Sequence, residues 1–370
     1  MAVERTTEFP LNTTEGINHS QEDEGGVFGF AMYSVTVPLL FGIITLIGVI
    51  GNSLVIYVIL SRKRMHSVTN ILLLNLAVAD LSFVMVIPPF TAYQFAKSQW
   101  PFGDAVCKLM HYLVNVTAYV TVYTLVLISA IRYMTIVHHT ATAQLRTKRK
   151  VILMIIGIWS LMLLLNSPVM VVYSSQSVSA TVSDCNHNSL SAARYLFTTF
   201  FTFAYLIPLL IIGVLSVCIL YYIQSQKVSL VDKNRRTKSF KKKRRASRLI
   251  ILVVVIFAIL WLPIHIHLLL AFYGHLPSSK FYHAVSVLFN CAAYANSCVN
   301  PFIYNHASRE FRQAFREVIC CIPGGRLQGP RLSLSTGTTK LTLSPLDAAN
   351  KSPESEPLQN VKNADEDKSL

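Results

Sequence analysis

The feature that most constrains this sequence is a series of long apolar stretches that are almost free of charge. Asp80 is the only acid between Gly25 and Gly103, and there is none between Ala105 and Ser183. A helix of about 20 apolar residues crosses the hydrocarbon core of a bilayer with all its backbone polar groups satisfied. Seven stretches have this character: 33–60, 70–95, 105–137, 150–173, 194–225, 248–274 and 281–304. They predict an all-α membrane protein, a seven-helix transmembrane bundle over residues 33–304.

The positions of the basic residues predict how this bundle is oriented. The net charge is +15, and Lys and Arg gather at 62–64, 146–150 and 227–248, in the first, third and fifth connections. The second, fourth and sixth connections are nearly free of them, apart from Lys97 and Lys280. Because cytoplasmic loops carry the excess of Lys and Arg, we expect a multi-pass plasma-membrane protein with an extracellular amino terminus. This distribution suits anionic lipid and argues against nucleic acid as a partner.

The segments outside the bundle have their own signatures. Residues 1–32 form a predicted extracellular tail with glycosylation sequons at Asn12 and Asn18, and without the apolar core of a signal peptide. Residues 305–321 are expected to form an amphipathic eighth helix, which ends at two candidate palmitoylation sites, Cys320 and Cys321. Residues 322–370 are rich in Ser, Thr, Pro and charge, which predicts a disordered cytoplasmic tail.

Two cysteines fall on the predicted outer side. Cys107 opens the third stretch and Cys185 lies in the connection after the fourth, so we expect a disulfide between them. In the same connection Val178, Ala180 and Val182 alternate with polar residues, a period that favours a short β-hairpin.

Polar residues inside the apolar stretches are the first candidates for function, because ionisable groups at bilayer depth are costly. The clearest is Asp80, which could instead be a neutral acid bonded to a neighbouring helix. The other oxygen-rich side chains near mid-helix are Asn52, Asn75, Thr121, Asn296, Ser297 and Asn300. One carboxylate among such groups could hold a small hard cation, such as sodium, with water. We predict no other cofactor.

Several motifs occur in one order along the chain: Gly51-Asn52, Leu76-Ala77-x-x-Asp80, Trp100 and Cys107, Arg132-Tyr133, Trp159, Cys185, Pro208, Phe257-x-x-x-Trp261-x-Pro263, and Asn300-Pro301-x-x-Tyr304. Together they resemble the rhodopsin-like G-protein-coupled receptors, from about Gly51 to Cys321. The resemblance implies that the chain is not an enzyme and that it activates a heterotrimeric G protein, of the Gi/o or Gq class. Arrestin and receptor kinases are implied further partners, and a Ser and Thr cluster at 333–339 would suit them.

The resemblance also implies roles at matched positions. The sodium pocket would comprise Asp80, Thr121, Asn296, Ser297 and Asn300. The activation switch would comprise Arg132, Tyr133, Val122, Pro208, Phe257, Trp261, Pro263 and Tyr304.

Two departures from the family pattern bear on activation. Ile131 stands where an acid normally precedes the arginine, so the usual salt bridge of Arg132 cannot form. Since an unpaired buried guanidinium is costly, we expect a weakened inactive state. Ser216 stands where an activation tyrosine is common, which would weaken the active state instead.

The ligand class follows from a narrower resemblance. Amine receptors have an aspartate where this chain has Val114, and opsins a lysine where it has Tyr294. Segments 138–146, 261–265 and 294–300 are similar to galanin and allatostatin-A receptors, with kisspeptin receptors close by. A peptide ligand is therefore expected.

Candidate peptide-binding residues are Gln94, His111, Asn115, His265, Phe272, His283 and Asn290. A lone histidine on an apolar helix is more often a packed core residue than a ligand contact. His265 is the stronger candidate, because it matches a pocket position in galanin-type receptors.

Three alternatives stay open at this point. An enzyme would need a phosphate-binding loop or a His pair on one helix face, and His265 and His267 point apart. A transporter or channel would more often show internal duplication and more than one intramembrane acid. An orphan receptor that signals without ligand is the third.

Overall fold

The computed structural model describes residues 24–97, 99–179, 182–228, 235–274 and 280–320, and the side chains of most of these. The statements below concern those residues. Asn12, Asn18, Cys321 and the segment 322–370 lie outside them, as do the side chains of 226–250 and of His283.

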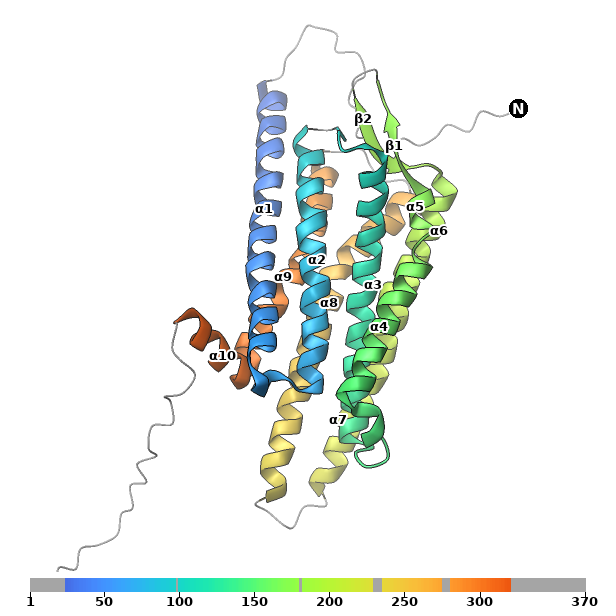
Figure 1. Ribbon diagram of the computed structural model, residues 1–370. Helices are drawn as coiled ribbons and strands as arrows, with labels where there is room; N and C mark the ends of the chain where they lie inside the picture. Colours follow the sequence, from blue (N-terminus) through green and yellow to red (C-terminus); the bar gives the residue numbers. More distant parts are fainter. Residues whose placement is uncertain (1–23, 98, 180–181, 229–234, 275–279, 321–370) are drawn as a thin grey trace, which may run out of the picture. The chain divides into compact units, whose positions relative to one another are not determined.

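The chain is mostly helical (Figure 1). Its elements are α1 (Glu24–Ser61), η1 (Lys63–Met65), α2 (Val68–Lys97), α3 (Gly103–Ile136), η2 (Ala143–Arg146), α4 (Lys148–Leu165), α5 (Val169–Val172), β1 (Tyr173–Ser177), β2 (Ser183–His187), α6 (Leu190–Phe200), η3 (Phe201–Leu206), α7 (Ile207–Val228), α8 (Arg235–Tyr273), α9 (Lys280–Ala307) and α10 (Arg309–Ile319). The segments α6, η3 and α7 run without a break and form one long helix of the bundle.

Six helical segments are long and apolar enough to cross a membrane: 34–61, 68–97, 103–136, 148–172, 190–225 and 251–273. The helix α9 is the seventh member of the bundle, and it packs against α1, α2 and α8. Their lipid-facing sides are rich in exposed Leu, Ile and Val, as burial in hydrocarbon rather than water requires. The predicted seven-helix membrane bundle with a short further helix is confirmed.

Close packing between α1 and α9 explains the glycine in Gly51-Asn52. A Cβ built at Gly51 would lie 3.0 Å from Cγ of Pro301, so only glycine lets α1 approach α9 this closely. The next residue, Asn52, is fully buried and its Nδ2 donates to the backbone oxygen of Ser297 at 2.8 Å. A small residue and a buried amide therefore join α1 to α9.

The prolines shape the helices in two ways. The helix α4 ends at Leu165, and Pro168 is the N-cap of the short α5, so this proline breaks the span. Pro208 lacks an N–H group, which leaves the carbonyl of Ala204 without its usual donor. The π-helical turn η3 precedes Pro208 and changes the hydrogen-bond pattern at this place. Pro263 and Pro301 lie inside α8 and α9.

The predicted β-hairpin is present, but it is built from other residues. Strands β1 and β2 pair antiparallel with Tyr173 opposite His187 and Ser175 opposite Cys185. The alternating residues lie between the strands, where the N–H group of Val178 donates to the oxygen of Val182 at 2.8 Å. The mostly polar residues on either side of the alternation form the strands.

One helix end differs from its predicted place. The helix α1 begins at Glu24, ahead of the predicted start at residue 33. The helix α8 extends back beyond the apolar stretch 248–274 to Arg235. At the end of the bundle, α10 begins after Ser308, whose hydroxyl accepts from the N–H group of Phe311. Its apolar face buries Phe311 and Phe315, one turn apart. We call the end of the bundle with β1 and β2 the hairpin end, and the opposite end the α10 end.

Candidate functional site

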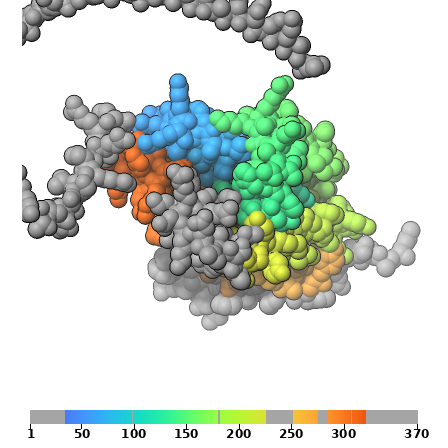
Figure 2. All heavy atoms as spheres, turned by 90° about the horizontal axis from the view of Figure 1, so that it is seen from below, coloured from blue at the N-terminus to red at the C-terminus, as the bar shows by residue number. Residues whose placement is uncertain are grey.

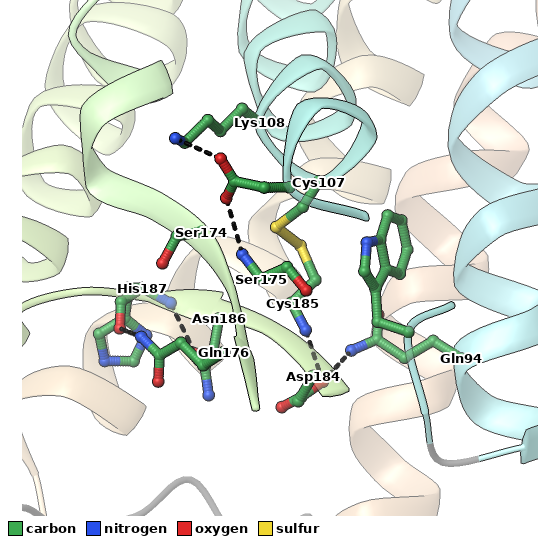
Figure 3. The surroundings of a disulfide bond; sticks show 12 residues. Gln94, Cys107, Lys108, Ser174, Ser175, Gln176, Asp184, Cys185, Asn186 and His187 are labelled. Atoms are coloured by element: carbon green, nitrogen blue, oxygen red, sulfur yellow. Dashed lines mark hydrogen bonds and ion pairs between the residues drawn. A yellow bond between two sulfur atoms is a disulfide. The ribbon is translucent and has the colours of Figure 1, made fainter. Parts of the chain in front are cut away.

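The hairpin is fixed to α3 by a covalent bond and by a hydrogen bond. Cys107 of α3 and Cys185 of β2 form the predicted disulfide, with their Cα atoms 5.6 Å apart (Figure 3). One turn before Cys107, Asp104 Oδ1 accepts from the N–H group of Ser175 at 3.0 Å. The other oxygen of Asp104 lies 2.5 Å from Nζ of Lys108. Both strands of the hairpin are therefore bonded to the first turns of α3.

A second set of bonds ties the hairpin to α2. Gln94 Nε2 donates to Asp184 Oδ1 at 2.9 Å, and the N–H group of Trp100 donates to the oxygen of Ser183 at 2.7 Å. Asp184 Oδ1 also accepts from the N–H group of Cys185. The predicted ligand contact Gln94 thus holds the loop in this structure, so a ligand that used it would compete with Asp184.

His111 lies against the disulfide and the hairpin. Its ring stacks on Tyr173 at a centroid distance of 3.6 Å and an angle of 6°. One of its ring nitrogens and the two sulfurs of Cys107 and Cys185 lie within 4.8 Å of one another. While the two sulfurs are bonded to each other they offer no thiolate, so this group cannot hold a metal ion. His111 therefore lines the hairpin end of the bundle.

An aromatic path continues from the hairpin into the bundle. His187, opposite Tyr173 in the hairpin, contacts the ring of Phe272 of α8 at 5.5 Å. Phe272 stacks with Phe197 of α6 at 4.5 Å. Partial burial lowers the pKa of His187 below its usual value, which keeps its imidazole neutral at pH 7. This part of the path is aromatic, and Arg194 is a cation beside it, since its Nε donates to the backbone oxygen of Phe272 at 2.8 Å.

One turn after Phe197 on the same helix, Phe200 contacts His265 of α8, so this turn of helix connects the two groups of rings. The imidazole of His265 is 2% exposed, and its ring lies 5.2 Å from Phe200, 4.7 Å from Tyr205 and 5.9 Å from Trp261. Trp261 in turn lies 5.9 Å from Phe257. The predicted pocket residue His265 and the predicted switch residues Trp261 and Phe257 therefore form one continuous cluster.

The other predicted ligand residues are less closely joined. Asn115 is 8% exposed, and its Nδ2 donates to the oxygen of His111 within α3 at 2.9 Å. Asn290 makes the same kind of bond to Ser286 within α9. These amides satisfy their own helices, so the structure does not connect them to the aromatic path. Sequence reasoning missed Tyr173, His187 and the aromatic residues of 197–205, although a run of four phenylalanines and one tyrosine in that segment was a visible signal.

The intramembrane carboxylate has partners on α9. Asp80 is 1% exposed, and its Oδ2 accepts from Asn300 Nδ2 at 2.7 Å. The hydroxyl of Ser297 also bonds to this carboxylate. Three of the five predicted sodium-pocket residues are thus joined directly. Thr121 and Asn296 are buried, at 6% and 4% exposed, and no described contact connects them with Asp80.

The surroundings of Asp80 suit a cation in chemical type. They include a carboxylate, a hydroxyl and side-chain amides, all buried. Two buried oxygens of neighbouring residues, Asn52 Oδ1 and the hydroxyl of Tyr304, have no hydrogen-bond partner among the described residues. Unsatisfied buried oxygens are expected where water or an ion completes a network. The residues present therefore fit a small hard cation with water.

Five residues of the predicted switch are buried, Arg132, Tyr133 and Pro263 are partly buried, and some of the polar atoms have no hydrogen-bond partner among the described residues. Val122, Phe257 and Trp261 are all below 8% exposed, and Pro208 is buried too. The indole Nε1 of Trp261 has no partner within the described part of the chain. Tyr304, fully buried, packs its ring on Phe311 of α10 at 5.5 Å. An unpaired donor and an unpaired hydroxyl leave these side chains free to form bonds in another packing.

Arg132 is a cation of the described bundle that has no acidic partner there. Its Nε is buried without a hydrogen-bond partner, and no described acid pairs with it. Ile131, at 5% exposed, packs in the core instead of supplying a carboxylate. The sequence contains one acid, Asp232, between Asp184 and Glu310, so few acids could reach Arg132. The predicted loss of the usual salt bridge agrees with this geometry.

The connection after Arg132 is held by other bonds. Tyr133 and His138 interact through the hydroxyl and Nε2 at 3.3 Å. Arg146 of η2 donates to Thr135 Oγ1 at 3.3 Å and to the oxygen of His139 at 2.5 Å. Figure 2 views the molecule from the α10 end, where this green segment, the yellow-green end of α7 and the blue and orange segments of α1 and α10 lie around one face. Cys320, the candidate palmitoylation site within the described chain, is exposed at the end of α10.

Comparison with known proteins adds to this geometry. Residues 51–304 match the 7 transmembrane receptor (rhodopsin family). The chain is 37% identical to the allatostatin-A receptor of Bombyx mori over 83% of its own length and 85% of that protein. It is 35% identical to galanin receptor type 2 of Homo sapiens, which covers 87% of this chain and 82% of the relative. With galanin receptor type 1 of Rattus norvegicus it shares 34% identity over 84% and 91%.

Proposed function

The chain belongs to the rhodopsin family of seven-transmembrane receptors, and we propose that it binds an extracellular neuropeptide of the galanin or allatostatin-A type. The observation that carries the proposal is the aromatic path from the hairpin through His265 to Trp261. It offers a peptide a contact at the hairpin end and connects that contact with the core of the bundle. The similarity to two receptor types named for peptides supports the ligand class.

The proposed response follows the same path. A ligand group that presses on His265 shifts a ring already in contact with Trp261, whereas one that presses on Phe272 acts through Phe197 and the next turn of the same helix, where Phe200 contacts both His265 and Trp261. Trp261 lies in the turn of α8 before Pro263, where the missing N–H group makes the helix easiest to bend. Movement of α8 at the α10 end would uncover Arg132 for an acidic or carbonyl group of a heterotrimeric G protein of the Gi/o or Gq class. Arrestin and receptor kinases are the proposed partners of the tail beyond Cys321.

The proposed placement is the plasma membrane, with the hairpin end and the glycosylated residues Asn12 and Asn18 outside. The basic segments 62–64 and 146–150 both lie at the α10 end, in agreement with a cytoplasmic location there. Palmitoylation of Cys320 and Cys321 would hold α10 at the inner surface of the membrane.

Sodium is proposed as the ion held at Asp80. Asn300, Ser297 and Asp80 would supply the oxygen ligands with water, and Thr121 and Asn296 are proposed to line the same site. A bound cation would neutralise the carboxylate and favour the packing in which α2 and α9 stay together.

The test is nucleotide exchange on purified G protein with the full-length receptor and a panel of galanin and allatostatin-A peptides. We expect one class to stimulate exchange, and His265→Ala to raise the EC50 at least about tenfold, which corresponds to about 1.4 kcal/mol. The matched control is His267→Ala, which removes an imidazole two residues away that contacts Phe289 of α9 instead of the path. Equal increases of the EC50 in His265→Ala and His267→Ala would contradict a role of the aromatic path in peptide binding. Exchange without any peptide would favour a constitutively active receptor. Ion or solute flux without exchange would favour a transporter or channel.

A further inference from the structure

The helix α10 carries an acid that its setting does not explain. It has three arginines, Arg309, Arg312 and Arg316, as expected for a helix beside anionic headgroups. Glu317 lies near its carboxyl-terminal end, where a negative charge also interacts unfavourably with the helix dipole. Its side chain is nevertheless only 8% exposed. A carboxylate in such a place requires compensating partners.

The partners come from the other end of the sequence. Glu317 Oε2 accepts from Arg64 Nη2 at 2.7 Å, and Arg62 Nη1 lies 3.6 Å from the same oxygen. The second oxygen, Oε1, accepts from Gln313 Nε2 at 3.1 Å within α10. The hydrogen bond from Arg64 lowers the pKa of Glu317 below its usual value, so the group stays ionised at neutral pH. Both oxygens are therefore occupied, and the charge is matched.

The turn that supplies the arginines is itself fixed to the bundle. Arg62 is the N-cap of η1, Arg64 lies inside it, and Met65 is 1% exposed. Asn70 of α2 donates through Nδ2 to the oxygen of Met65 at 2.8 Å. An ion pair to this turn therefore connects α10 to the α1–α2 pair. Figure 2 shows the orange α10 beside the blue segment at this end.

The helix α10 thus has two attachments of different kinds. Near its start, Phe311 packs on Tyr304 of α9, and Arg312 donates to the backbone oxygens of Asn305 at 3.3 Å and His306 at 2.7 Å. Near its end, Glu317 reaches η1. The contacts near the start of α10 all reach the end of α9, whereas the ion pair further along reaches a different part of the bundle and so fixes the direction of α10.

We infer that Glu317 is a positioning residue, which holds α10 against η1 through Arg64 and Arg62 and so sets the direction of α10 at the face that meets the G protein. The structural part of this inference does not depend on the ligand. Its consequence for signalling rests on the proposed coupling to a G protein.

The experiment measures the direction of α10 directly in the full-length receptor. Nitroxide labels on Cys320 and on Lys63→Cys report the α10 to η1 distance by pulsed electron resonance, with Cys218 and Cys321 replaced by serine. We expect a narrow distance distribution in the parent chain and loss of the narrow component in Glu317→Gln. Glu310→Gln, which removes the same charge two turns earlier on α10, should retain it.

Charge exchange separates the ion pair from a general effect on the helix. Glu317→Arg alone should lose the narrow component, and the double variant Glu317→Arg with Arg64→Glu should restore it. A narrow distribution in Glu317→Gln, or no restoration in the double variant, would overturn the inference. In nucleotide exchange the same variants should lower and restore the maximal rate. If the parent receptor stimulates no exchange with any peptide, the proposed function fails while the distances still decide the role of Glu317.

Discussion

The two ends of the bundle satisfy their charges in different ways. At the hairpin end, the described acids Asp104 and Asp184 bond to Lys108, Ser175 and Gln94, and a disulfide adds a covalent connection. At the α10 end, Glu317 forms ion pairs with two arginines, and no described acid forms one with Arg132. The acids at the hairpin end therefore have their partners within the chain. At the α10 end, the guanidinium of Arg132 has no acidic partner among the described residues, and a partner protein could supply one.

Removal of the disulfide should have the largest effect, because it releases the hairpin end from α3. We expect Cys185→Ser to abolish peptide-stimulated exchange and to lower stability by about 2–5 kcal/mol. Cys107→Ser should match it, and the double variant should be no worse, since either change removes the same bond. Ligand binding and thermal unfolding in detergent measure both effects. Cys218→Ser, at an exposed free cysteine of α7, is the control. A fully active Cys185→Ser receptor would show that the hairpin end does not need its covalent connection.

Between the two ends, Asp80 joins α2 to α9 through its hydrogen bond with Asn300. Sodium should raise the EC50 of the peptide in the parent receptor, compared with an equal concentration of a large organic cation. We expect Asp80→Asn to abolish most of this difference, about tenfold or 1.4 kcal/mol, because an amide retains a bond to Asn300 without the negative charge. The measurement is nucleotide exchange in the two salts. Undiminished sodium sensitivity in the variant would place the ion elsewhere.

Much of this arrangement can be predicted from sequence, for physical reasons. Asp80 and Arg132 stand out because charge is costly in an apolar stretch, and Cys107 and Cys185 because both fall on the predicted outer side. These properties belong to single residues. The aromatic path depends on the register of β1 and β2, which places His187 opposite Tyr173, and sequence does not set that register.

The ion pair of Glu317 could not be predicted from the sequence either. Its ion pair joins residues 253 positions apart. It forms because Ser308 starts α10 at one particular place, where the hydroxyl caps the helix. A helix that began one residue later would turn the carboxylate by about 100° away from η1. The general face of α10 is therefore predictable from Phe311 and Phe315, whereas its polar contacts are not.

A smaller effect is expected when the α10 end receives the acid that it lacks. Ile131→Asp places a carboxylate next to Arg132, which should stabilise the inactive packing and lower exchange without peptide about threefold, or 0.7 kcal/mol. The control Ile131→Asn brings a polar group of the same size without charge and should lower it less. Basal exchange at matched receptor surface density measures the effect. If Ile131→Asp leaves basal exchange unchanged, the unpaired guanidinium does not set it, and Ser216→Tyr becomes the informative variant.

The smallest effect is expected from a change at Asp184, which tests whether peptide binding depends on the charge of this residue or on its hydrogen bonds. Asp184→Asn removes a negative charge but keeps an oxygen for Gln94 and for the N–H group of Cys185. We expect the EC50 of the peptide to stay within about threefold of the parent value, because the hydrogen bonds of this partly exposed side chain are kept and a charge close to solvent contributes little. Asp184→Ala removes the acceptor too and should shift the EC50 further, as Gln94→Ala should from the other side. An equally large shift in Asp184→Asn and Asp184→Ala would mean that the carboxylate attracts the peptide itself, and the hairpin end would then present a charge to its partner just as the α10 end does.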